Sequence, residues 1–126
     1  MAIIGTATGP YVLDALNEEI IIGPGGTITD INLSDTEALL FNISSTTGTW
    51  TITTNASLDG VDYFAINLGV ITSFPSSSTV SASASTISNI YIINHSNLPY
   101  IRFRMTAYTS GVVTLGPFLT RRTGTR

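Results

Sequence analysis

Apolar and polar residues alternate along much of the chain with a period of two, which is typical of strands that bury one face. The alternation is clearest in three segments, residues 39–43, 50–57 and 101–108. A slip of one residue in the last segment would bury arginines and expose a phenylalanine, so its register is strongly specified. The side chains expected to face the core are those of Leu39, Phe41, Ile43, Trp50, Ile52, Thr54, Ala56, Ile101, Phe103, Met105 and Ala107.

Short segments of this kind recur along the chain with no helical period between them. The predicted strands are Ile20 to Ile22, Thr27 to Leu33, Leu39 to Ser44, Trp50 to Leu58, Tyr63 to Leu68, Ile87 to Ile93, Tyr100 to Tyr108 and Val112 to Leu119. This pattern predicts an all-β fold, an antiparallel β-sandwich (jelly-roll-like) of about eight strands.

Turn residues separate the predicted strands. Residues 45–49, which include Gly48, should form a hairpin that leads into Trp50. Asp59-Gly60 is a second strong turn signal, and a third, Ser110-Gly111, should join two paired strands. The longest gap, residues 72–86, is rich in serine and should be a surface loop or an extended edge segment.

The pattern divides the chain into three parts. Residues 1–17 contain glycine, proline and small residues without a sustained period, and we expect an extended N-terminal arm. Residues 18–120 should form the β-sandwich domain, and residues 121–126 a basic C-terminal tail. A helix near residues 13–19 would be too short to be stable alone.

Charge is scarce and unevenly distributed. Charged residues make up 10% of the chain, against about 25% in an average protein. All eight acidic residues lie between positions 14 and 62, and all five arginines lie between positions 102 and 126. Either the sheets interleave the two halves and mix the charges, or the basic tail docks on an acidic face of a neighbouring copy or partner. The net charge of −3 argues against nucleic acid as the main partner.

Cysteine content and the N-terminal sequence bear on where the protein is made and whether it enters a membrane. The chain has no cysteine, so disulfides and thiolate metal sites are excluded. The N-terminus lacks the pattern of a secretory signal, and no apolar run approaches the ~18 residues needed to span a bilayer. We therefore expect synthesis in a cytoplasm and no insertion in a membrane.

Residues with catalytic or metal-binding chemistry do not converge on a site. The single histidine, His95, lies between two predicted strands and is interpreted as a surface loop residue, because no Gly-x-Ser-x-Gly elbow accompanies it. Asp59 and Asp62 could ligate Ca²⁺, but such a pair more often caps a turn. We predict no catalytic residues, no metal, no cofactor and no enzymatic activity.

The aromatic residues suggest binding rather than catalysis. Trp50 shares a phase with Ile52 and should lie in the core instead of forming a sugar-stacking platform. Four tyrosines are better candidates for the surface, where tyrosine favours assembly interfaces: Tyr63, Tyr91, Tyr100 and Tyr108.

Three motifs carry a resemblance to a known group of proteins. They are Gly48-Thr49-Trp50-Thr51-Ile52, then Ala56-Ser57-Leu58-Asp59-Gly60 with Tyr63, and Tyr100-Ile101-Arg102-Phe103-Arg104 followed by Tyr108-Thr109-Ser110-Gly111. Together they resemble a β-sandwich module of tailed-bacteriophage structural proteins and, more distantly, discoidin-like carbohydrate-binding jelly rolls. The position after Asp59-Gly60 carries Tyr63-Phe64 where the pattern has a tryptophan, which weakens any inherited sugar binding.

The resemblance implies a structural protein of the virion, made in the host cytoplasm. The leading hypothesis is a capsid decoration (cement) protein, a homo-oligomer with a trimer favoured, that binds the major capsid protein on the capsid exterior. The alternatives are a carbohydrate- or host-surface-binding module and a tail or neck adaptor. The interface candidates are Ile3, Ile4, Tyr11, Phe74, Tyr108, Arg121 and Arg122.

Overall fold

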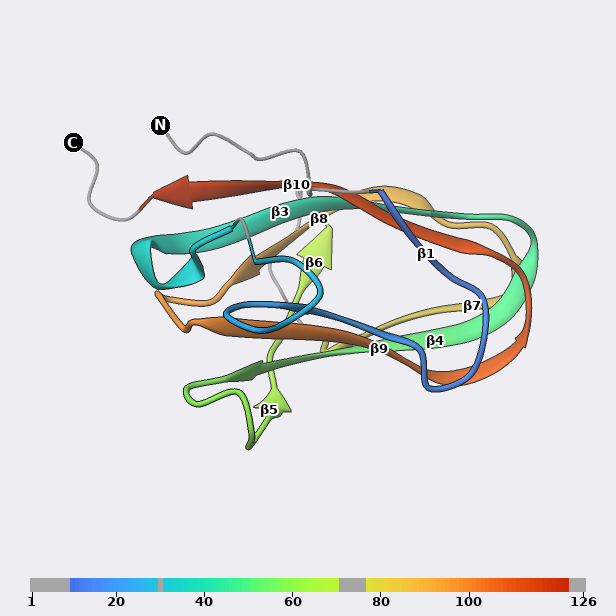
Figure 1. Ribbon diagram of the computed structural model, residues 1–126. Helices are drawn as coiled ribbons and strands as arrows, with labels where there is room; N and C mark the ends of the chain where they lie inside the picture. Colours follow the sequence, from blue (N-terminus) through green and yellow to red (C-terminus); the bar gives the residue numbers. More distant parts are fainter. Residues whose placement is uncertain (1–9, 30, 71–76, 123–126) are drawn as a thin grey trace.

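Two antiparallel sheets pack face to face in the computed structural model, which describes residues 10–29, 31–70 and 77–122 (Figure 1). Sheet A has the strand order β1 (Tyr11–Leu13), β10 (Val113–Arg122), β3 (Thr36–Ser45), β8 (Ser88–Asn94) and β6 (Gly69–Val70). Sheet B has the order β2 (Glu19–Ile22), β9 (Tyr100–Ser110), β4 (Gly48–Ser57) and β5 (Phe64–Ala65), and β7 (Thr79–Ser85) also pairs with β4. The predicted all-β sandwich is confirmed.

The connectivity is that of a jelly roll. Without the two-residue strands β5 and β6, the sheets read β1-β10-β3-β8 and β2-β9-β4-β7. Successive strands of these eight therefore lie in opposite sheets, except β4 and β7, which pair with each other in sheet B, as in double-sheet jelly rolls. The single helical element of the described residues is a 3-10 turn, η1 (Leu33–Asp35).

Two predicted turns are corners between sheets, so the prediction of hairpins there was wrong. Residues 45–48 lead from β3 in sheet A to β4 in sheet B, and residues 110–112 lead from β9 back to β10. The corners pack on each other, with Thr46 N–H donating to the Val112 carbonyl at 3.0 Å. Gly48 is required because a Cβ there would collide with the carbonyl oxygen of Ser110. This close approach favours a corner over a hairpin.

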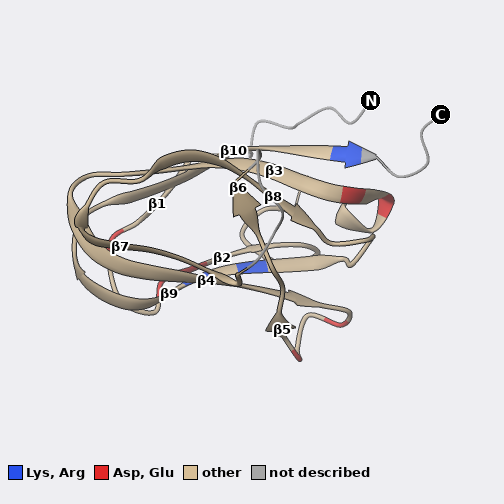
Figure 2. Cartoon of the chain, turned by 180° about the vertical axis from the view of Figure 1, so that it is seen from behind, with Lys and Arg blue, Asp and Glu red and all other residues tan. Residues whose placement is uncertain are grey.

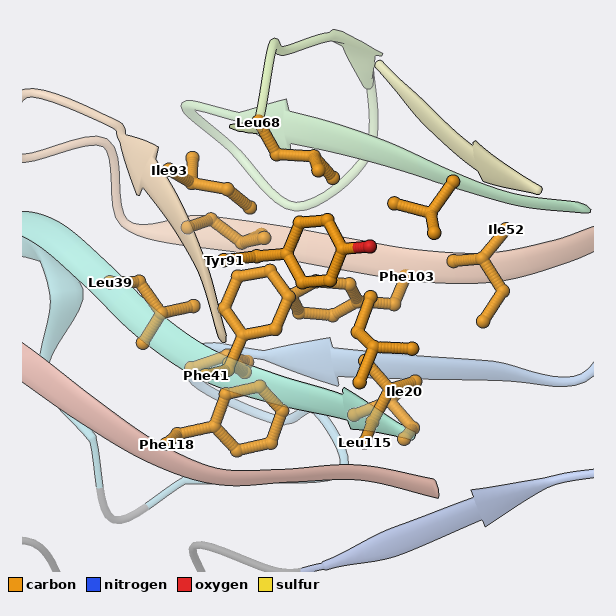
Figure 3. Packing of buried hydrophobic residues seen from close by; sticks show 14 of the residues in the cluster. Ile20, Leu39, Phe41, Ile52, Leu68, Tyr91, Ile93, Phe103, Leu115 and Phe118 are labelled. Atoms are coloured by element: carbon orange, nitrogen blue, oxygen red, sulfur yellow. The ribbon is translucent and has the colours of Figure 1, made fainter. Parts of the chain in front are cut away.

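Aromatic residues from both sheets fill the centre of the core (Figure 3). The ring of Phe41 lies 5.0 Å from that of Phe103 in an edge-on arrangement and 5.7 Å from that of Phe118. Tyr91 stacks on Phe41 at 6.0 Å and is 5% exposed, so its interpretation as a surface residue was wrong. Trp50 is 1% exposed, which confirms its predicted place in the core.

One predicted core residue, Ala107, is exposed. In the pairing of β4 with β9, Thr51 lies opposite Ala107 but Ile52 lies opposite Met105, so one extra residue bulges from β9. A bulge reverses the side-chain phase beyond it. Met105 is therefore buried, and Tyr108, two pairs further along, turns back toward the core beside Trp50.

Two other predicted strands are mostly loop. In 27–33, Ile28 makes only an isolated bridge to Ile22, and the Asn32 side chain accepts a hydrogen bond from Ser34 N–H at 3.2 Å. Such a local cap competes with strand pairing and begins η1. Within 63–68, only residues 64–65 are strand, and Leu68 adds an isolated bridge to Ser77. In the serine-rich gap, the described residues include β7 on the free side of β4, which matches the expected edge segment.

Candidate functional site

A row of apolar side chains crosses the outer face of sheet A. Leu119 on β10 pairs with Leu40 on β3, and Leu40 pairs with Ile92 on β8, so the three lie side by side on one face. Ile90 lies on the same strand face, two residues from Ile92. Leu119 is 52% exposed and Ile90 is 48% exposed. We call these four residues the apolar row.

Small uncharged residues continue this face beyond the apolar row. A shallow hollow of about 570 Å³ lies beside Ile90 and is lined by Asn42, Ser44, Ser88 and Asn89, among others. At the other end of the face, Arg121 pairs with Glu37 across 3.8 Å, and both side chains are about half exposed. The central part of the outer face, made of the apolar row and the hollow beside it, therefore contains no charged residue among those named.

A second exposed apolar surface is the loop of residues 57–64, between β4 and β5. Leu58, Val61 and Phe64 are 78%, 77% and 72% exposed, more than the other large apolar side chains of the described residues. Beside the loop lies a groove of about 410 Å³. The groove is mostly apolar, with carboxylates at its rim, and is lined by Ala56, Ser57, Leu58, Asp59, Asp62, Phe64, Ala65, Ile66 and Leu98. We call this the 57–64 groove.

Asp59 holds this loop in one conformation. Its Oδ1 accepts hydrogen bonds from Val61 N–H at 2.8 Å, from Asp62 N–H at 2.9 Å and from the Ser57 hydroxyl at 3.0 Å. The bonds from the backbone N–H groups of Asp62 and Val61 lower the pKa of Asp59 below its ordinary value of 3.8. The carboxylate of Asp59 therefore caps the turn. This is one of the two interpretations considered from the sequence, the other being a calcium site.

Contacts with β9 also hold this loop in place. Gly60 has φ +79°, and a Cβ there would lie 2.9 Å from the ring of Tyr100. The guanidinium of Arg102 lies 4.3 Å from the ring centre of Tyr63, a cation–π contact, and its Nη2 donates to Asn55 at 3.3 Å. Burial raises the pKa of Tyr63, and the nearby charge of Arg102 acts in the opposite direction. The loop is thus held rigidly while its apolar side chains face solvent.

The two halves of the charge distribution meet in several places (Figure 2). Glu19 on β2 pairs in register with Arg104 on β9, and Glu37 makes an ion pair with Arg121. These contacts agree with the interpretation that the sheets mix the charges. Asp59 and Asp62 have no salt-bridge partner among the described residues, and Figure 2 shows the acidic loop before β5 in the layer opposite the basic end of β10.

His95 is buried, so its interpretation as a surface histidine was wrong. It is 1% exposed, and its Nε2 lies 3.1 Å from the hydroxyl oxygen of Thr36. That hydroxyl donates to the Leu33 carbonyl at 3.1 Å, so its oxygen accepts from Nε2–H. Burial lowers the pKa of His95 to about 4, an effect that the Leu98 backbone only partly offsets. His95 is a neutral part of the core that ties the end of β8 to the start of β3.

The described residues contain no group of three histidine, cysteine or carboxylate side chains that could hold a metal ion. No helix in the same part of the chain is long and apolar enough to cross a bilayer.

The predicted interface residues that the structure describes lie on three strands, β1, β9 and β10. Tyr11 and Tyr108 are partly buried against the core, and the Tyr108 hydroxyl donates to the Gly111 carbonyl at 2.8 Å. Arg121 is exposed near the end of β10, and Arg122 is the last residue of that strand. The other three candidates, Ile3, Ile4 and Phe74, lie outside the described residues.

Sequence reasoning missed both exposed apolar surfaces. A signal for the apolar row was present, because residues 90–93 are apolar without interruption and a strand with two apolar faces exposes one unless it is covered. No such signal marked Leu58, Val61 and Phe64, which fall on a loop and a very short strand.

No protein-family model matches this sequence. No curated protein matches it either. Among solved structures, the fold is similar to that of the SPBc2 prophage-derived protein YomS, with a TM-score of 0.59 and 14% identity over 89% of this chain and 93% of that chain. The enzymatically active domain of tailspike protein 4 from bacteriophage CBA120 has a TM-score of 0.43 at 10% identity, over 90% of this chain and 15% of that chain. A CBM4 structure has a TM-score of 0.42 at 10% identity, over 73% of this chain and 57% of that chain. At these identities the likeness concerns the fold alone.

Proposed function

We propose that this chain is a structural component of a phage particle, a capsid decoration protein that acts as a homo-oligomer bound to the major capsid protein. The observation that carries this proposal is the apolar row on the outer face of sheet A. Leu40 and Ile92 are partly covered, and Leu119 and Ile90 are about half exposed, in a central region without charged residues. Exposed apolar surface of this kind marks sites of protein association.

The phage context has two supports. The sequence motifs resemble structural modules of tailed phages, and the fold is similar to that of a prophage-derived protein over most of both chains. Neither support specifies a position in the particle. The capsid surface is proposed because a sheet face with an apolar centre suits adhesion to a lattice of identical subunits.

The competing role of a sugar-binding module has less support. Stacking on a sugar needs an exposed aromatic face, whereas Trp50 and Tyr91 lie in the core. The ring of Tyr63 is covered on one side by Arg102. Phe64 is the large aromatic residue that remains well exposed in the described part of the chain.

The test is to purify particles of the phage or prophage that encodes the chain and to measure the chain in them by mass spectrometry. Immunogold labelling should then place it on the head. Particles without the chain, or label on the tail only, would refute the decoration role.

A further inference from the structure

We propose that the 57–64 groove receives the C-terminal segment of a second copy of this chain, residues 119–126. The inference rests on the proposed function only in taking the chain to act as a homo-oligomer. It assigns a partner to the groove on sheet B, a surface that the apolar row does not include. Leu119 is the one residue of the apolar row that the inserted segment contains.

The groove has the chemistry of a site for an apolar side chain flanked by positive charge. Leu58, Phe64 and Leu98 contribute apolar walls, and Asp59 and Asp62 contribute carboxylates. The hydrogen bonds of Asp59 use Oδ1, and the side chain of Asp62 makes no salt bridge among the described residues. Two negative charges thus stand beside exposed apolar groups, and no salt bridge among the described residues balances them.

The end of β10 carries the complementary chemistry. Leu119 is 52% exposed, and the side chain of Arg121 is 56% exposed. The sequence from Leu119 to the last residue contains Arg121, Arg122 and Arg126, three of the five basic residues of the chain, and no acidic residue. The arginines of this segment are attracted by the carboxylates of Asp59 and Asp62, and the apolar walls of the groove do not repel them.

The arrangement of the strands favours a neighbouring copy as the source of this segment. β10 stays paired with β3 as far as Arg122, across two register shifts, so its end remains in sheet A. β5, whose residues line the groove, lies at the edge of sheet B beyond β4, in the opposite layer (Figure 1). A contact between two different surfaces of identical chains is heterologous and can close into a ring. The trimer expected from the sequence is one such closed ring.

Rigidity of the groove makes it suitable for this role. The Asp59 hydrogen bonds, the contact of Gly60 with Tyr100 and the Arg102–Tyr63 stacking fix the loop before any partner arrives. A preorganised surface loses little conformational entropy on binding. Exposed ion pairs contribute little on their own, so we expect the apolar contacts of Leu58 and Phe64 to supply most of the affinity and the charges to fix the orientation.

Charge exchange in the full chain tests the inference, with mass measured by light scattering after size-exclusion chromatography over a range of concentrations. Asp62→Lys should raise the dissociation concentration of the oligomer at least tenfold. Asp14→Lys makes the same change of charge at an exposed position away from the groove and should leave the oligomer intact. Adding Arg122→Asp to Asp62→Lys should restore assembly, because the charges then match again in exchanged positions.

A second measurement separates loss of contact from loss of fold. Phe64→Ser should also weaken the oligomer tenfold or more, while the fluorescence of the buried Trp50 stays at its native wavelength. A synthetic peptide of residues 117–126 should compete with assembly, and the same peptide with its arginines replaced by glutamine should not. A wild-type chain that is monomeric at millimolar concentration would overturn the inference, as would equal behaviour of the Asp62→Lys and Asp14→Lys variants. Either result would leave the presence of the chain in particles to be decided by mass spectrometry.

Discussion

The buried histidine predicts a specific loss of stability in mild acid. In the native state, burial lowers the pKa of His95 from 6.5 to about 4. Its Nδ1 is buried without a hydrogen-bond partner among the described residues, so a charged ring would lose its hydration and regain little of it from the Leu98 backbone. The unfolded chain binds this proton more tightly than the native chain, and acidification therefore favours unfolding.

The size and range of the effect follow from the two pKa values. Stability is unaffected by His95 above pH 6.5, declines as the pH falls below that value, and reaches its full loss below pH 4. At 1.36 kcal/mol per pH unit, the full loss is about 3 kcal/mol, and roughly 2 kcal/mol is already lost at pH 5. That is a large part of the stability of a small domain. It also precedes the titration of Asp59, whose pKa lies below 3.8.

Urea denaturation at pH 8 and pH 5, followed by the fluorescence of the single tryptophan, measures this loss directly. His95→Gln is the matched variant, since its amide can still donate to the Thr36 hydroxyl but cannot take up a proton. We expect the wild-type free energy of unfolding to fall by about 2 kcal/mol over this range and that of the variant to change little. Parallel losses in the two proteins would show that other groups cause the acid sensitivity and that His95 is not a buried neutral residue.

Four further predictions concern the core and the loop. Trp50→Ala should lower the free energy of unfolding by about 3 to 5 kcal/mol in urea titration, whereas a loss below about 1 kcal/mol would place the side chain at the surface. Gly48→Ala should cost about 1 to 3 kcal/mol or more, because the new methyl group meets backbone of the facing corner and neither corner can yield freely. Ala107→Lys should change stability by less than about 0.5 kcal/mol, while Met105→Ala should cost about 2 to 5 kcal/mol, and a reversed order would contradict the bulge between them. The carboxyl of Asp59 should titrate below 3.8 by NMR, so the stability it provides is present above its ordinary pKa and is lost as the pH falls through its lowered one.

The sequence was sufficient to locate most strands, because alternation is a local property. Trp50 and Phe103 lie on the predicted faces. β3 and β9 include the predicted segments, and β4, β8 and β10 include all but one terminal residue of theirs. The choice of partner strand is not local. The same Gly-containing turn suits a hairpin or a corner, and here the packing of Gly48 against Ser110 distinguishes them.

The remaining differences have similar causes. The bulge in β9 depends on how β4 pairs with it, so the exposure of Ala107 could not be deduced from β9 alone. His95 looks like a polar loop residue, and only the approach of Thr36 from a distant part of the chain provides a buried hydrogen bond for it. The 57–64 groove is likewise formed by segments that meet only in the folded structure, since Leu98 lines it together with Phe64.

The place of β10 in sheet A has a consequence for how the chain is made. β1 pairs only with β10 among the described strands, and β3 needs β10 to complete one of its two sides. Both early strands must therefore wait until β10 has left the ribosome to complete their pairing. Pairing between such distant segments is slow, and unpaired strand edges invite association with other chains in the meantime. Sheet A should consequently reach its native pairing only after β10 has left the ribosome, in contrast to folds whose first hairpin forms early in translation.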